Sequence, residues 1–131
     1  MSTTPAPSCP FCAIPESAWL GQNELAFWVH DIAPSAPGHA LVIPRRHVAS
    51  FFELVPEERS GMLALLNEAK IVADERYRPD GYNIGLNDGE VAGQTVPHVH
   101  LHLIPRRAGD VPDPRGGVRW VLPETAPYWN R

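Results

Sequence analysis

The sequence predicts an α+β domain in which an antiparallel sheet of about five strands packs on one main helix. Short apolar runs lie on both sides of a single long stretch with helical spacing, which gives the order strand, strand, helix, strand, strand. With 131 residues, 44% of them hydrophobic and 20% charged, the chain is long and apolar enough for a soluble domain with its own core. We therefore expect a single domain over residues 1–131, with its core at 9–107 and an extended C-terminal tail at 108–131.

The first half of the chain is expected to supply two neighbouring strands. Residues 24–30 carry alternating apolar side chains, as a strand with one buried face does. Residues 31–39 contain prolines and a glycine and are expected to form a loop, whereas the continuous apolar run at 40–44 indicates a buried strand. A short turn over 50–54 follows, with Ser50 as its capping residue.

The main helix is expected to run from Pro56 to Tyr77. Pro56 suits the first turn of a helix, and Glu57 and Glu58 place negative charge at its positive end. Apolar residues at helical spacing give the segment one core face, made of Met62, Leu65, Leu66, Ala69, Val72, Ala73 and Tyr77. The sequence Pro79-Asp80-Gly81 then ends the helix.

The second half of the chain is expected to supply two more strands and an irregular tail. Residues 81–87 alternate as a strand, 88–94 form a glycine-rich turn, and 95–104 form a strand that ends at Pro105. The tail from Arg106 has no clear periodicity, apart from a possible short strand at 118–122.

The most informative segment is the row of three histidines, His98, His100 and His102, which alternate with aliphatic residues over 98–103. In a strand, alternate residues share one face, so all three imidazoles are expected to point the same way. Such a row could be a polar solvent face, part of a metal site, or a catalytic group.

The solvent face is the uninformative interpretation, and a single metal ion bound by all three histidines is also unattractive. The backbones of His98 and His102 would lie about 13 Å apart on a straight strand, whereas zinc–nitrogen bonds are about 2 Å long. Catalysis fits better, because an imidazole is nucleophilic at neutral pH and its neighbours can donate to a developing negative charge.

The row also resembles the signature of the histidine triad (HIT) family. Residues 98–104 match every position of the pattern His-φ-His-φ-His-φ-φ, in which φ is an apolar residue. Residues 87–96 resemble the glycine-rich approach to the triad in that family, and residues 30–39 and 41–47 resemble its N-terminal half. The resemblance covers about residues 9 to 107 and implies a HIT-like fold.

The resemblance implies a nucleotide hydrolase or transferase with a covalent nucleotidyl-histidine intermediate. In the family the middle histidine, here His100, attacks the α-phosphorus, and the backbone carbonyl of the first, here His98, orients its ring. The third, His102, resembles a donor to phosphate oxygens, and His39 an electrophilic or leaving-group contact. Substrates of the family include dinucleoside polyphosphates and nucleoside phosphoramidates. The tail from Gly109 resembles a bacterial branch often labelled diadenosine polyphosphate hydrolase.

The resemblance also implies a pocket for a purine nucleotide. Asp31 matches the acidic residue that binds the ribose hydroxyls, although on its own it also reads as a turn aspartate before Pro34. The apolar residues that match positions around the base are Phe11, Ile14, Val29 and Ile32. On the phosphate side, the matching residues are Asn87 and Thr95, with the backbone amides near Gly93 and Gln94.

A structural zinc site is the expected role of Cys9 and Cys12, the only cysteines, which have the close spacing of a zinc knuckle. The resemblance to bacterial members supplies His47 and His98 as the other two ligands. The alternatives are two free thiols and a redox pair; the redox pair is less favoured because no helix pattern opens at Cys9.

Charge and hydropathy limit the partners of the chain. A net charge of −4 gives no basic field for nucleic acid, and there is no apolar run long enough to span a membrane. Residues 1–10 lack the features of a signal peptide, so a cytoplasmic location is expected. A nucleotide-binding module without turnover, or a metal-storage or sensor protein, is the competing function.

We also expect a homodimer. The resemblance is the main reason, and the helix adds a physical one, because Leu63 and Ile71 lie off its main apolar stripe.

Overall fold

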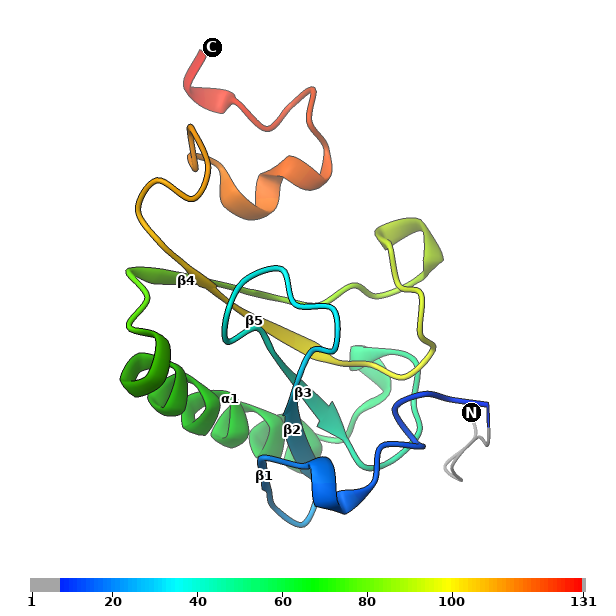
Figure 1. The fold of residues 1–131 in the computed structure, drawn as a ribbon. Coiled ribbons are helices and arrows are strands. Elements are labelled where there is room, and N and C mark those ends of the chain that lie inside the picture. Colours follow the sequence, from blue (N-terminus) through cyan, green and yellow to red (C-terminus); the bar gives the residue numbers. More distant parts are fainter. Residues whose placement is uncertain (1–7, 131) are drawn as a thin grey trace.

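The computed structural model describes residues 8–130, and the predictions that concern residues 1–7 and 131 lie outside the described residues. Five antiparallel strands form one sheet in the order β1-β2-β3-β5-β4, and helix α1 (Pro56–Tyr77) packs on one of its faces (Figure 1). The strands are β1 (Gly21–Gln22), β2 (Ala26–His30), β3 (Ala40–Pro44), β4 (Gly81–Gly85) and β5 (Leu101–Arg106). This architecture confirms the predicted α+β class.

Helix α1 has the boundaries and the core face that the sequence predicts. At its start, the Glu58 carboxylate accepts the Val55 N–H at 2.9 Å and two N–H groups of Arg46 at 3.0 and 2.8 Å. These bonds, chiefly those from Arg46, lower the pKa of Glu58, so the carboxylate stays ionised at the positive end of the helix. The predicted stripe faces the sheet, with Met62, Leu65, Ala69 and Ala73 buried and Leu66 and Val72 packed beside them.

Strands β2 and β3 are buried on both faces. On the α1 side, Trp28, Val42 and Leu103 belong to one core cluster. On the other side, the chain N-terminal to β1 covers a second cluster with the side chains of Phe11, Ile14 and Trp19; its strand residues are Phe27, Val29, Leu41 and Ile43. The second cluster matters for function, because it places the N-terminal segment on the sheet face that does not contact α1.

The strand expected at 95–104 is wrong at both ends, because β5 begins only at Leu101 and continues through Pro105 to Arg106. Pro97 has no N–H to give to a ladder. The side-chain amide of Gln94 donates to the carbonyls of Ala49 and Val96, and the Val99 N–H donates to Val48. These bonds attach the segment to the connection after β3 rather than to a strand. His98 and His100 therefore precede β5, and only His102 lies within it.

Smaller differences have similar local causes. The first predicted strand begins at Ala26 rather than at residue 24, because the Asn23 side chain accepts the amides of Leu25 and Ala26. The strand expected at 81–87 ends at Gly85, and the segment expected as a strand at 118–122 is a 3₁₀ turn over Gly117–Val121. The short strand β1 was not predicted.

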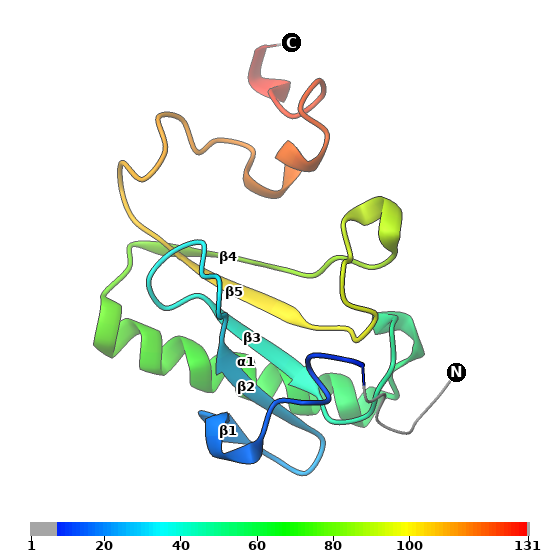
Figure 2. The same cartoon turned by 45° about the vertical axis from the view of Figure 1, so that its right-hand side comes forward.

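The tail after β5 curls into a small unit on the side of the sheet opposite α1 (Figures 1 and 2). Its Gly117–Val121 turn contacts β4. Arg119 donates to the carbonyls of Ala126 and Thr125, and the Arg115 guanidinium lies 4.5 Å from the Trp129 ring centre. Within residues 8–130, no helix combines the length and apolar character needed to cross a membrane.

Candidate functional site

The floor of the candidate site is a row of side chains across three strands. Val29 of β2 pairs with Leu41 of β3, which pairs with His102 of β5. Residues paired in this way share one face of a sheet. That face is the one away from α1, where Val29 and Leu41 belong to the second core cluster.

A cavity of about 400 Å³ opens above this floor. All nine residues that were predicted to contact the nucleotide line it, together with two of the predicted catalytic histidines: Phe11, Ile14, Val29, Asp31, Ile32, Asn87, Gly93, Gln94, Thr95, His100 and His102. Ile32 lies at the rim, because its side chain is fully exposed. Pro10, His30, Leu41 and Val96 complete the lining and were not assigned from the sequence. No sequence pattern singled out Leu41, because its place opposite Val29 depends on the strand register.

The ring of His100 is oriented by the backbone two residues earlier. Its Nδ1 lies 2.9 Å from the carbonyl oxygen of His98. Since a carbonyl can only accept, Nδ1 carries the proton and Nε2 keeps its lone pair. Phe11 packs edge-on against the same ring, with a centroid distance of 4.7 Å. An imidazole held with a free lone pair in a cavity can act as a nucleophile.

Ser35, His39 and His102 form a chain of hydrogen bonds, which we call the relay. The Ser35 N–H at its start sets the proton positions on both imidazoles. The Ser35 N–H donates to His39 Nδ1 at 3.0 Å, so His39 Nε2 carries the proton and donates to His102 Nδ1 at 2.9 Å. In its neutral form His102 therefore carries its proton on Nε2. Burial first, then the nearby His100 and His39, lower the pKa of His102 to about 4, and burial lowers the pKa of His39 despite the opposing effect of Asp31. Both rings are neutral at pH 7, and the relay supplies a donor without a charge.

Asp31 has the hydrogen bond of a turn aspartate and also lines the cavity. One carboxylate oxygen accepts the Ala33 N–H at 2.9 Å, as a turn aspartate does, and the other lies 3.7 Å from His39 Nε2. A carboxylate has about four acceptor positions, so this pattern leaves capacity for further donors at the cavity wall.

The backbone amides of the glycine-rich turn form hydrogen bonds within the turn itself. Gly93 donates to the Glu90 carbonyl at 2.9 Å, and Gln94 donates to the Gly89 carbonyl at 3.1 Å. The side chain of Gln94 also accepts the Gly89 N–H. Gly93 has a φ of 100°, a conformation that a glycine adopts without strain. Gly93 and Gln94 therefore shape the turn, and Asn87 and Thr95 line the cavity on either side of it.

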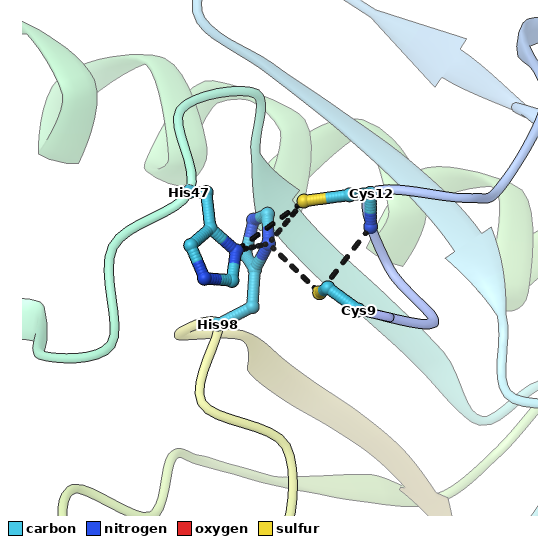
Figure 3. Close-up of side chains that lie close together, drawn as sticks. All are labelled: Cys9, Cys12, His47 and His98. Carbon is cyan, nitrogen blue, oxygen red and sulfur yellow. Dashed lines mark hydrogen bonds between the residues drawn. The ribbon is translucent and has the colours of Figure 1, made fainter. Parts of the chain in front are cut away.

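Four side chains from three distant segments converge beside the cavity (Figure 3). Cys9 and Cys12 come from the N-terminal segment, His47 follows β3, and His98 precedes β5. Their ligand atoms all lie within 4.8 Å of one another. His98 Nδ1 is 3.5 Å from each sulfur, 3.2 Å from His47 Nδ1, and His47 Nδ1 is 3.3 Å from the sulfur of Cys12.

This geometry fits a tetrahedral zinc ion. Around zinc, two ligand nitrogens lie about 3.3 Å apart, and a nitrogen and a sulfur about 3.5 Å apart. His98 donates its Nε2 proton to the Pro44 carbonyl at 2.7 Å, which leaves Nδ1 unprotonated toward the cluster. Burial lowers the pKa of His98 and keeps it in the neutral form that a metal requires. The Cys12 N–H lies 3.4 Å from the Cys9 sulfur, as in a metal-bound thiolate turn.

The cluster and the cavity share the N-terminal knuckle. Phe11 lies between the two cysteines in sequence, and its ring contacts both His98 and His100. Any group that holds Cys9 and Cys12 in place therefore also holds one wall of this cavity.

The chain belongs to the HIT family, since the model of the HIT domain matches residues 15–109. Among curated proteins, it is 38% identical over 103 residues to the adenosine 5'-monophosphoramidase hnt1 of Schizosaccharomyces pombe, which covers 76% of this chain and 74% of that one. It is 41% identical over 80 residues, or 61% of this chain, to the asymmetrical bis(5'-nucleosyl)-tetraphosphatase of the same organism, of whose length it spans only 44%.

A solved structure gives the most extensive match of the three. A zinc-bound histidine triad family protein from Mycobacterium smegmatis is 36% identical, with a TM-score of 0.70, and covers 94% of this chain and 96% of that chain. The comparisons thus confirm the predicted family and fold.

Proposed function

We propose that the protein is a nucleotide hydrolase or transferase that acts at the α-phosphorus of dinucleoside polyphosphates or nucleoside phosphoramidates. The observation that carries this proposal is the orientation of His100. Its Nδ1–H donates a hydrogen bond to the His98 carbonyl, which leaves a lone pair on Nε2 in a cavity lined by Asp31 and His102. The relatives named phosphoramidase and tetraphosphatase support the same pair of substrate classes.

The reaction has two displacements at one phosphorus. His100 Nε2 forms a bond to the α-phosphorus, and the bond from phosphorus to the leaving oxygen or nitrogen breaks, so the leaving group departs with the electron pair and takes up a proton. Water, or another acceptor, then attacks the phosphorus, loses a proton, and breaks the phosphorus–nitrogen bond. The electron pair returns to Nε2, and a nucleoside monophosphate is released. His102 Nε2–H is suited to donate to a phosphate oxygen, where charge develops.

The rest of the nucleotide has a place in the same cavity. Asp31 accepts the two ribose hydroxyls, which is a charge-assisted pattern that favours ribonucleotides. A purine base packs against Phe11, Ile14 and Val29, with Ile32 at the rim. His39 donates a hydrogen bond from Nε2 to His102 Nδ1, and it faces the leaving group.

The Cys9, Cys12, His47 and His98 cluster is proposed as a structural zinc site. Four protein ligands close a tetrahedral ion, so zinc bound there would have no open position for a substrate. It would supply stability by tying the N-terminal segment to the chain ahead of β5. Thiolate ligands are best kept in a reducing compartment, which supports a cytoplasmic location.

A substrate panel tests the function. Purified protein is incubated with an adenosine phosphoramidate and, separately, with diadenosine polyphosphates, and the release of AMP is measured. We expect AMP from at least one substrate class and none from the His100→Ala variant. Tight AMP binding without turnover of any of these substrates would make the protein a nucleotide-binding module instead.

A homodimer is the proposed assembly. Leu63 and Ile71 on the outer side of α1 are 57% and 53% exposed, and β4 is an edge strand whose Ile84 is 48% exposed. Edge strands and exposed aliphatic side chains on one element favour pairing with a second copy. Light scattering at micromolar concentration tests this: a mass near the 14.5 kDa of one chain rejects the dimer. Leu63→Lys combined with Ile71→Lys should separate a real dimer into folded monomers.

A further inference from the structure

A second hollow lies outside the cavity lined by His100 and Asp31, which we call the nucleotide cavity. It has a volume of about 750 Å³ and lies between the loop before β3, strand β5 and the C-terminal tail. Apolar side chains make much of its lining, among them Pro37, Ile104, Val111, Val118 and Trp120. We call it the tail cavity.

A third hollow of about 330 Å³, which we call the connecting hollow, lies between the two cavities, because it shares lining residues with each. It shares His102 and Asn87 with the nucleotide cavity, and it shares Ile104 and Val118 with the tail cavity. One groove therefore runs from the reactive histidines to Trp120. His102 lines both the nucleotide cavity and the connecting hollow, whereas Phe11 lines only the former. Under the proposed function, a leaving group would therefore extend past His102 into this groove.

The connecting hollow suits a chain of phosphates. Within the described residues, its polar lining consists of neutral groups that can donate hydrogen bonds, namely Ser35, Asn83, Asn87, His39 and His102, and no carboxylate lines it. A phosphate chain in this position would meet donors and no fixed negative charge.

The tail cavity suits a nucleobase. Trp120 is 44% exposed, and its ring is held by an Nε1–H bond to the Arg115 carbonyl at 2.8 Å. The two lining carboxylates are already paired, Asp110 with Arg106 and Asp113 with Arg115, and the ion pair of Arg106 lowers the pKa of Asp110. A flat, partly exposed indole among apolar side chains is a platform on which a base can stack.

We propose that the tail cavity binds the second nucleoside of a dinucleoside polyphosphate, so that the groove selects this substrate class over phosphoramidates with small leaving groups. This inference rests on the proposed function, because it takes His100 as the point of attack. Its chemistry is the same displacement, in which the leaving group is a nucleoside polyphosphate whose distal nucleoside occupies the tail cavity.

The test compares two substrates in Trp120 variants. Replacing Trp120→Ala should lower the ratio of kcat/KM for diadenosine tetraphosphate to that for an adenosine phosphoramidate about tenfold, since one base loses its stacking partner. Trp120→Phe keeps a flat ring and should retain most of the ratio. Tyr128→Ala is the matched control, because it removes another exposed tail ring that does not line the cavity and should leave the ratio unchanged.

A second variant guards against misfolding of the tail. Val118 is 65% exposed and lines both the connecting hollow and the tail cavity. Val118→Glu places a carboxylate in the path of the phosphates, so it should also lower the ratio selectively. Unchanged ratios in both Trp120→Ala and Val118→Glu, or equal losses on both substrates, would overturn the subsite.

Binding separates this proposal from the proposed function. In the His100→Ala background, Trp120→Ala should weaken binding of diadenosine tetraphosphate about tenfold in calorimetry while AMP binding stays the same. If wild-type protein releases no AMP from any substrate, the proposed function fails, and this binding experiment alone decides the subsite: equal affinities with and without Trp120 reject it.

Discussion

His98 and His100 lie two residues apart, yet they belong to two different sites with opposite proton positions. His98 donates from Nε2 to the Pro44 carbonyl and turns Nδ1 toward two sulfurs and His47. His100 donates from Nδ1 to the His98 carbonyl and keeps Nε2 for the cavity. The same type of side chain is thus suited to bind a metal in one place and to act as a nucleophile in the other, because its second nitrogen has a different partner.

The largest effect expected from breaking this pair is at His100. His100→Ala should lower turnover by roughly a thousandfold or more, because no covalent intermediate can form. The melting temperature and AMP affinity should change little, because this ring is not part of the Cys/His cluster. AMP release under single-turnover conditions measures the loss. A variant within tenfold of the wild type would contradict the nucleophile assignment.

Disrupting the Cys/His cluster that contains His98 should lower the stability of the protein more than its catalytic activity. Elemental analysis of protein purified without added metal should find about one zinc per chain. Cys9→Ser, or removal of the ion by a chelator, should lower the melting temperature by at least about 5 °C, since a structural site contributes folding free energy.

The same Cys9 variant should keep most of its turnover rate although its melting temperature falls. Any effect on activity should appear mainly as a higher KM, because Phe11 lies next to Cys12 in the chain and forms one wall of the cavity. A protein that contains no zinc and has two freely reactive thiols would remove this site. A variant with normal stability but no activity would show that the cluster is catalytic instead.

A substitution of Asp31 tests the part of the cavity wall that lies next to His39. Asp31→Ala should raise KM for a ribonucleotide substrate about tenfold, since two hydroxyl partners of a carboxylate are lost. For the matching substrate without either ribose hydroxyl, KM should hardly change. Equal effects on both substrates would leave Asp31 with its turn role only, as the bond from Ala33 alone would predict.

The smallest expected effect concerns acid stability and His102. Its pKa in the folded protein is about 4, below the value of 6.5 for a free histidine, so between these two pH values the unfolded chain binds more protons than the native one. The contribution of His102 is therefore complete above pH 6.5 and is lost as the pH falls toward 4. Urea midpoints measured in this window with saturating zinc should fall with acid in the wild type and fall less steeply in His102→Asn.

Much of the candidate site can be predicted from short sequence patterns. The spacing 98-100-102 identifies the histidines, and the pattern match assigns Asp31, Asn87 and Thr95, all of which line the cavity with His100 and His102. Helix α1 is equally readable, because an apolar stripe at helical spacing depends only on residues close in sequence. The boundaries of β5 are not, because Gln94 and Val99 bond to residues 48 and 49, far away along the chain.

The sequence by itself determined the fold class, the helix with its buried face, and the set of residues available for chemistry, since these follow from local periodicity and residue type. Only the tertiary structure decided which partners face the nitrogens of His98 and His102, because Pro44, Cys12 and His39 come from other segments. The tertiary structure also decided that the tail forms a cavity joined to the site. Trp120, Pro37 and Ile104 line that cavity together, and no periodicity in the tail encodes this arrangement.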